Sequence, residues 1–396
     1  MWLIVLGGAA VLASRRYSAA MGSSRPDLEG IFLPAASAVR QGVSPYETPG
    51  YVYSPIVAQL LSLFPDTGVA VRSWTAMTLA LAICSAFFVT RSFAGILSAT
   101  RQSLVFGLAC VTLLASWPLS WELWLGQTDL VSLCGICLAI FGSRNARASI
   151  TGTGLALGAA VKTWPILFWL WFARRQDGRH PRVLAADPRV RAAAWATIVT
   201  CALLIASFAL QGGLSGVGMM ARRTVEFSSQ PLAAYSALGA GRLLFRSTPV
   251  APPIAVSAVL QWTTTLAIAA VALLLMAITL LLPADDSLAL PNIAFCVILL
   301  LPVSHLSYLI LPLPAMWLWG GRALAQPRNR LIWLVLAVFG CWWFLALRTP
   351  AVGDGAAHTS FRSYLTILLA TLVTASVSVV ASWVLGHQPS PHPAPD

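Results

Sequence analysis

The sequence predicts an all-α polytopic membrane protein, and two features of its composition carry this prediction. Of the 396 residues, 58% are hydrophobic and only 10% are charged, whereas an ordinary soluble protein has roughly 25% charged residues. The hydrophobic residues also gather in runs of the length that a bilayer span needs, roughly 20 residues. A water-soluble fold is therefore excluded.

The apolar runs, taken in order, place the predicted helices. The run over 1–14 lacks the pattern of a cleavable signal peptide, so we expect a membrane anchor. The other runs cover 68–90, 103–121, 128–142, 150–173, 192–211, 254–282, 290–319, 331–347 and 362–386. Two runs hold polar residues halfway along, Lys162 in one and His305 in the other, which are tolerated only beside a cavity or at the interface. Splitting both runs gives about twelve spans.

The rest of the chain adds little outside the membrane. No polar stretch is long enough for a separate domain, so we predict a single integral membrane domain over 1–387 and a disordered, Pro-rich cytoplasmic tail over 388–396. The apolar segments 28–40 and 56–64 are expected to lie along the membrane surface as interfacial helices.

Arginines set the predicted orientation. The six between 174 and 191 mark one side as cytoplasmic, and the termini share that side if the spans number twelve. Arg15 and Arg16, which follow the first predicted helix, do not fit this pattern, and neither do the arginines of the loop over 212–253. We expect a multi-pass protein of the plasma membrane whose unusual polar residues face outward.

The net charge of +12 is spread over short loops. Of 25 basic residues, Lys162 is the one lysine, and the arginines form no continuous basic face. Nucleic-acid binding is therefore not expected, whereas membrane lipids and phosphate groups are suitable partners. The seven cysteines lie in apolar runs and predict no disulfide framework.

The first outer loop holds the earliest acidic residues, Asp27 and Glu29. An Asp that follows Pro is a good helix N-cap, so the choice lies between capping and a role in a site. Tyr46 and Tyr53 follow in a turn-rich aromatic stretch, where interfacial anchoring is the alternative to substrate binding.

Later loops add further candidates. Glu122, Gln127 and Asp129 lie beside tryptophans between two predicted helices, where they can bind a sugar or mark the interface. Lys162 can hold a phosphate or extend its ammonium to the interface. His305 can hydrogen-bond a phosphate or a sugar hydroxyl, or simply pack at the interface.

Several familiar motifs are missing from the sequence. Gly154 and Gly158 lie in an apolar run and predict a helix-packing face rather than a nucleotide site. Cys134 and Cys137 form a CxxC motif without a second ligand pair, so no metal site is expected. There is also no Asp-x-Asp pair for a nucleotide sugar, and we predict no cofactor.

The order of these features resembles one family, the polyprenyl-phosphate-mannose-dependent mannosyltransferases of glycosyltransferase family 87, within the GT-C class. The resemblance covers about 25 to 320 and rests on Asp27, the stretch Gly42–Tyr46, Tyr53–Pro55, Gly126 with Gln127, Lys162–Pro165, and Ser304 with His305. It implies a GT-C glycosyltransferase fold with an outward-facing site beside a lipid-filled groove.

The resemblance also implies an activity. The chain would transfer a sugar, mannose in alpha-1,2 linkage, from a polyprenyl-phosphate donor to a glycolipid or glycan acceptor by an inverting one-step mechanism, as in cell-envelope glycolipid biosynthesis. Asp27 would be the general base, His305 would orient the donor, and Lys162 and Arg242 would hold its phosphate. The predicted substrate-binding residues are Glu29, Tyr46, Tyr53, Glu122, Gln127 and Asp129.

Two alternatives stay open at this point. The same fold could use another lipid-linked sugar, such as arabinofuranose, because sugar choice depends on a few pocket contacts. A lipid or solute transporter would instead show inverted halves with broken helices in matching positions. No clear internal repeat is present, which favours the enzyme.

Overall fold

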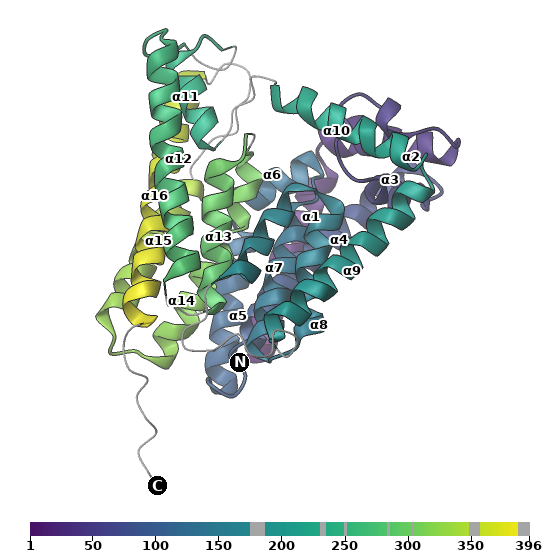
Figure 1. Ribbon diagram of the computed structural model, residues 1–396. Coiled ribbons are helices and arrows are strands. Elements are labelled where there is room, and N and C mark those ends of the chain that lie inside the picture. Colours follow the sequence, from purple (N-terminus) through teal and green to yellow (C-terminus); the bar gives the residue numbers. More distant parts are fainter. Residues whose placement is uncertain are drawn as a thin grey trace.

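A computed structural model describes residues 1–174, 187–229, 235–248, 252–282, 286–302, 304–347 and 357–386. Within these ranges every regular element is a helix, as predicted (Figure 1). Four helices are long and apolar enough to cross a membrane: Thr67–Arg91 (α4), Pro188–Ala209 (α9), Ala258–Leu281 (α12) and, within α16 (Ala357–Gly386), Tyr364–Gly386. Helices α5 (Ala99–Leu114) and α6 (Trp117–Leu125) form a bent pair, which brings the number within the described residues to five if the pair is one span. The larger total of about twelve stays a prediction.

The first helical group consists of α1 (Trp2–Met21), α4 to α6, α7 (Asp129–Arg144), α8 (Ala148–Val161) and α9. Close backbone contact joins α7 to α8, because a Cβ on Gly154 would lie 2.5 Å from the Gly135 carbonyl oxygen. A Cβ on Gly158 would lie 3.4 Å from the Ser132 Cα on α7. The predicted small-residue packing face is therefore confirmed.

The first helix is longer than the sequence indicated. It continues to Met21, so Arg15 and Arg16 lie inside it and do not follow it. The reason is visible at Arg16, whose guanidinium donates to the Leu114 carbonyl and to the Ser120 hydroxyl, both at 2.6 Å. An arginine with protein acceptors does not have to end a membrane helix.

The run predicted over 103–121 is broken. Helices α5 and α6 meet at an angle of 56°, because Ser116 accepts a hydrogen bond from the Leu119 N–H as the N-cap of α6 and Pro118 lies in its first turn. Both breaks that we predicted are also present. Helix α8 ends at Val161 before the 3-10 helix Trp164–Ala173 (η3), and α13 (Asp286–Leu300) ends before the 3-10 helix Leu306–Ile310 (η5).

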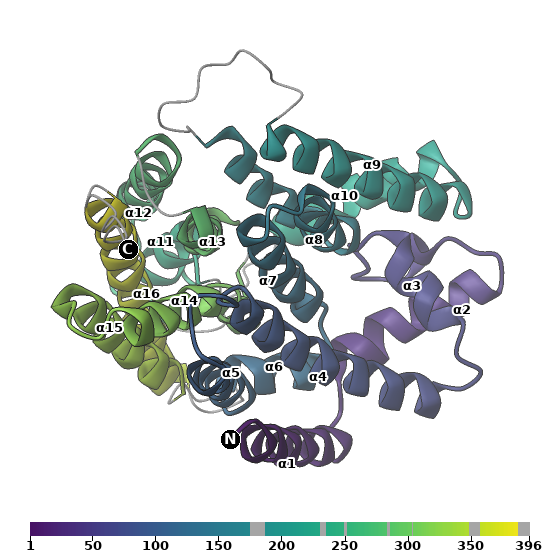
Figure 2. The ribbon, with the colours of Figure 1, turned by 90° about the horizontal axis from the view of Figure 1, so that it is seen from below.

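The second helical group consists of α11 (Ala237–Phe245), α12, α13, α14 (Leu313–Ala325), α15 (Arg330–Leu347) and α16. Figure 2 shows this group beside the first one. Buried tryptophans join the two groups and the helices within them. The indole N–H of Trp317 on α14 donates to Thr112 on α5 at 2.8 Å, and that of Trp342 on α15 donates to Thr371 on α16 at 2.9 Å.

Shorter elements cover one end of the bundle, the end opposite to the start of α1 and the end of α16 in Figure 1. They are a π-helical turn Leu28–Phe32 (η1), α2 (Leu33–Arg40), the 3-10 turn Pro45–Glu47 (η2), α3 (Pro55–Ser62) and α10 (Leu214–Ser229). The predicted interfacial segments thus form helices. The predicted tail over 388–396 lies outside the described residues, and so do most of the arginines between 174 and 187.

Candidate active site

The turn after α1 presents Asp27. Arg25 is only 3% exposed, and its guanidinium donates to the Ala20 and Ser23 carbonyls and pairs with Glu29 at 3.3 Å. This arginine therefore ties the end of α1 to the start of η1. Asp27 lies between these contacts as the half-buried residue that precedes η1.

A buried aromatic cluster supports that turn. The Tyr46 hydroxyl donates to the Tyr53 carbonyl at 3.0 Å, and the Tyr51 hydroxyl donates to the Ser54 carbonyl at 2.7 Å. The ring of Phe32, from η1, meets the ring of Tyr53 edge-on with centroids 4.7 Å apart. Buried hydrogen bonds and ring contacts therefore hold the stretch 45–55 in place, and Tyr46 is one of the residues that make them.

The junction of α6 and α7 supplies three polar residues, Glu122 from α6, Gln127 from the loop and Asp129 from the start of α7. Gly126 takes a left-handed conformation with φ of 75° and ends α6. Gln127 follows, and α7 begins at Asp129. One Glu122 oxygen, Oε1, accepts the Asp129 N–H at 2.7 Å and the Leu130 N–H at 3.3 Å. Glu122 is fully buried and caps the N-terminus of α7, where a negative charge is favoured.

The break between α8 and η3 places Lys162 against this loop. Its ammonium pairs with Asp129 Oδ1 at 2.5 Å and donates to Gln127 Oε1 at 3.1 Å. The nitrogen also lies 4.8 Å from the ring centroid of Tyr308 and 5.2 Å from that of Tyr53. Lys162 is 5% exposed and Asp129 is fully buried, so the structure encloses this charge pair.

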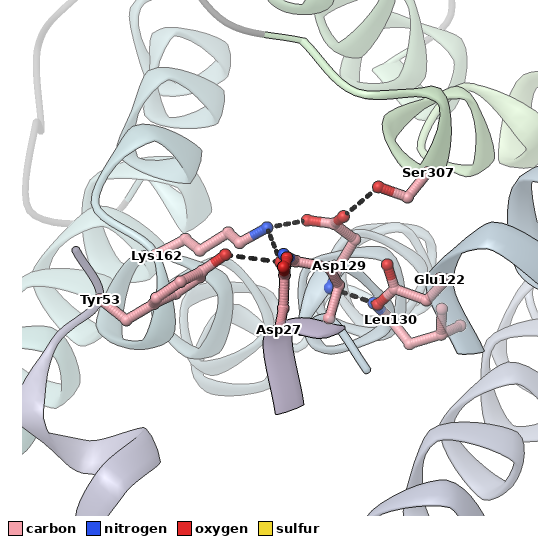
Figure 3. Close-up of polar contacts among 8 residues, drawn as sticks. Asp27, Tyr53, Glu122, Asp129, Leu130, Lys162 and Ser307 are labelled. Carbon is pink, nitrogen blue, oxygen red and sulfur yellow. Dashed lines mark hydrogen bonds and ion pairs between the residues drawn. The ribbon is translucent and has the colours of Figure 1, made fainter. Parts of the chain in front are cut away.

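Gln127 and Ser307 complete the set. The amide nitrogen of Gln127 donates to Asp27 Oδ2, and its oxygen accepts the Tyr53 hydroxyl at 2.5 Å. The Ser307 hydroxyl, from η5, donates to Asp129 Oδ2 at 2.8 Å. Figure 3 shows these contacts as one connected set of side chains. We call them the polar network, which consists of Asp27, Tyr53, Glu122, Gln127, Asp129, Lys162 and Ser307.

The electrostatics of Asp27 suit a base. Burial raises the pKa of Asp27 above its ordinary value, and the hydrogen bond from Gln127 opposes this rise, as does the charge of Lys162. The pKa of the Asp27 carboxyl is therefore raised by burial, while the amide donor of Gln127 favours the ionised form. This combination is typical of a carboxylate that exchanges a proton during a reaction.

His305 lies in the loop between α13 and η5, close to the network but outside its hydrogen bonds. Its ring meets the Tyr308 ring edge-on at 5.7 Å and lies 6.4 Å from that of Phe227 on α10. Burial, together with the Lys162 charge, lowers the pKa of His305 to about 4. The imidazole is therefore neutral at pH 7, so it can donate or accept a hydrogen bond there but carries no charge.

The structure thus unites six of the predicted site residues, Asp27, Tyr53, Glu122, Gln127, Asp129 and Lys162, and separates the others. Glu29 pairs with Arg25 at the surface, and Arg242 lies half-buried on α11. Helix α11 starts near His305, because the Tyr235 N–H donates to the Ser304 carbonyl at 2.7 Å. Sequence reasoning missed Arg25 and Ser307 as contributors. Ser307 could have been found from the sequence, because it lies two residues after the candidate His305. No feature of the sequence indicates that Arg25 is buried.

The described residues are all helical where they are regular, with apolar helices long enough to span a membrane and a polar network rich in carboxyl groups at one end. The family model of glycosyltransferase family 87 matches residues 51–304. This match covers more than half of the chain, and the chain belongs to that family, which indicates a membrane glycosyltransferase. The matched region contains Tyr53, Gln127, Asp129 and Lys162. A search of the curated proteins finds no match.

Proposed function

We propose that the chain transfers a sugar from a polyprenyl-phosphate donor to a lipid or glycan acceptor at the end of the bundle that holds the polar network. The sugar that we propose is mannose, which would be joined to the acceptor in an alpha-1,2 linkage. The observation that supports this most is the position of Asp27, a half-buried carboxylate held by Gln127 at the edge of a buried network in a glycosyltransferase of family 87.

The proposed reaction needs a proton acceptor and an anion stabiliser. The acceptor hydroxyl attacks the anomeric carbon, its proton passes to Asp27, and the bond from that carbon to the phosphate oxygen breaks with its electrons on the phosphate. A single displacement inverts the anomeric centre. Asp27 suits the first task because Gln127 occupies Oδ2, which leaves Oδ1 for the acceptor hydroxyl.

The charges of the network bear on where the phosphate lies. Lys162 is surrounded by the carboxyls of Asp27, Glu122 and Asp129, and its ammonium pairs directly with Asp129. We propose that Lys162 adds positive charge near the leaving phosphate, and that Arg242 contacts the phosphate, since α11 begins beside the His305 loop. The neutral His305 would then donate a hydrogen bond to the phosphate or the sugar.

We also propose that the network faces outward from the plasma membrane. Arginines lie at the ends of α4, α7 and α14 and at the start of α15, on the side where α1 begins and α16 ends in Figure 1. Cytoplasmic loops carry such an excess of Arg. The opposite end, with the network, would meet a lipid-linked donor on the outer face.

The experiment is a donor panel on isolated membranes that contain the protein. Labelled polyprenyl-phosphate-mannose and polyprenyl-phosphate-arabinofuranose are offered separately, and the anomeric configuration of each glycolipid product is determined. We expect mannose transfer with inversion. Transfer of arabinofuranose alone would replace the sugar and keep the reaction, whereas transfer with retention would reject the single displacement. No transfer from either donor would count against the proposed donor class.

A further inference from the structure

The Gln127 side chain occupies the centre of the polar network, between two donors and one acceptor. A glutamine amide has an oxygen that only accepts and an NH₂ group that only donates. Its oxygen receives the Tyr53 hydroxyl at 2.5 Å and the Lys162 ammonium at 3.1 Å. Its NH₂ group faces Asp27.

Chemistry fixes this orientation of the amide. If the amide were turned over, its NH₂ group would face the Lys162 ammonium, which has three N–H donors and no acceptor. The ammonium cannot turn away without cost, because Asp129 holds it at 2.5 Å and Ser307 holds Asp129 at 2.8 Å. The network therefore allows one orientation of Gln127.

That orientation determines which kind of hydrogen bond Gln127 makes with Asp27. An NH₂ group gives a hydrogen bond to a carboxylate oxygen but accepts none from a carboxylic acid. The ionised form of Asp27 is therefore stabilised at Oδ2, and the side chain is held in one direction. Both effects come from residues that lie far along the chain, since Gln127 is 100 positions from Asp27.

We propose that Gln127 is a positioning residue, kept in one amide orientation by Lys162 and Tyr53, which holds Asp27 ionised and aimed at the acceptor hydroxyl. This inference rests on the proposed function, because it assumes that Asp27 is the base. It gives Gln127 a role through Asp27 instead of direct contact with the sugar. In this role Lys162 and Tyr53 act on Asp27 through Gln127, by holding its amide oxygen.

The first test is the pH profile of transfer by Gln127→Met, which keeps the length of the side chain and removes both polar ends. Losing a hydrogen bond to a charged group should raise the acidic midpoint of kcat/KM by about one pH unit. The other titratable groups that act on Asp27, namely Lys162, Asp129 and Tyr53, are all retained. Activity at pH above the new midpoint should recover toward the wild-type value.

The matched control is Gln59→Met. The Gln59 amide donates to the Ser207 carbonyl at 2.7 Å, joining α3 to α9 outside the polar network. This variant loses a comparable amide contact, but its acidic midpoint should equal that of the wild type. An unchanged midpoint in Gln127→Met, with transfer that still depends on Asp27, would overturn the positioning role and leave the proposed function standing.

A second measurement requires no sugar transfer. A hydrophobic carbodiimide reacts with the protonated carboxyl, so the pH dependence of Asp27 labelling, quantified by peptide mass spectrometry, follows its ionisation. The labelling midpoint should be about one pH unit higher in Gln127→Met than in the wild type and in Gln59→Met. Equal midpoints in all three proteins would reject the inference even if the donor class proved wrong.

Discussion

Removing the ammonium of Lys162 tests whether the buried charge pair holds the network together. Lys162→Met leaves Asp129, a fully buried carboxylate, without its ammonium partner, while Ser307 still donates to Oδ2. Breaking a buried pair by removing one partner costs about 3–5 kcal/mol, because the other charge stays buried without compensation. We expect a loss of that size in the free energy of unfolding of Lys162→Met.

The double variant Lys162→Met with Asp129→Asn separates this cost from lost packing. Asparagine keeps an oxygen for Ser307 and carries no charge, so the double variant should be more stable than Lys162→Met by about 2 kcal/mol or more. The assay is reversible unfolding of the purified protein in mixed micelles, followed by tryptophan fluorescence.

An exposed pair gives the control. Arg222 and Glu226 are 3.1 Å apart, but their side chains are 83% and 45% exposed, so Arg222→Met should cost less than about 1 kcal/mol. Two results would contradict this prediction. Lys162→Met could lower the free energy of unfolding no more than Arg222→Met does, or the losses from Lys162→Met and Asp129→Asn could be additive in the double variant. Either result would show that the Lys162–Asp129 pair does not stabilise the network.

Two further predictions concern the residues around the network. Gly126→Ala should lower stability by about 2 kcal/mol and abolish transfer, because a Cβ there would lie 2.4 Å from the Leu28 Cβ, beside Asp27, at a φ of 75°. Gly42→Ala, with the same φ but open space around it, should show the backbone cost alone, and equal losses in the two variants would refute the steric argument. The folded-state pKa of His305 is about 4 against an ordinary value of 6.5, so the unfolded chain binds the proton first and stability should fall as the pH drops from 6.5 toward 4. His305→Gln should flatten that part of the melting-temperature profile, and an unchanged slope would show that His305 is not buried in its neutral form.

The sequence predicted which residues are unusual better than it predicted their partners. Asp27, Gln127 and Lys162 stood out because charged and amide groups are costly in so apolar a chain. Their meeting point depends on the packing of distant helices, as in the bond between Ser307 and Asp129, which are 178 positions apart. No local pattern contains that information, so Lys162 was predicted as a phosphate ligand without its partner Asp129.

The helix boundaries show the same division. The break near Lys162 followed from a charge inside an apolar run, and it is present. The break at Ser116 was missed, although a capping serine two residues before Pro118 is a local signal for a helix start. The extension of α1 through Arg16 had no local signal, since it depends on acceptors supplied by the α5–α6 region.

The most direct test of the central claim is sugar transfer by Asp27→Asn in membranes supplied with labelled polyprenyl-phosphate-mannose and total lipid acceptors. Asparagine keeps the shape and removes the proton acceptor, so transfer should fall by about 10²-fold or more while the protein level in the membrane stays unchanged. Glu47→Gln, which alters an exposed acid of the next loop, should retain wild-type transfer. Labelling by Asp27→Asn at the wild-type rate would contradict the assignment of Asp27 as the base.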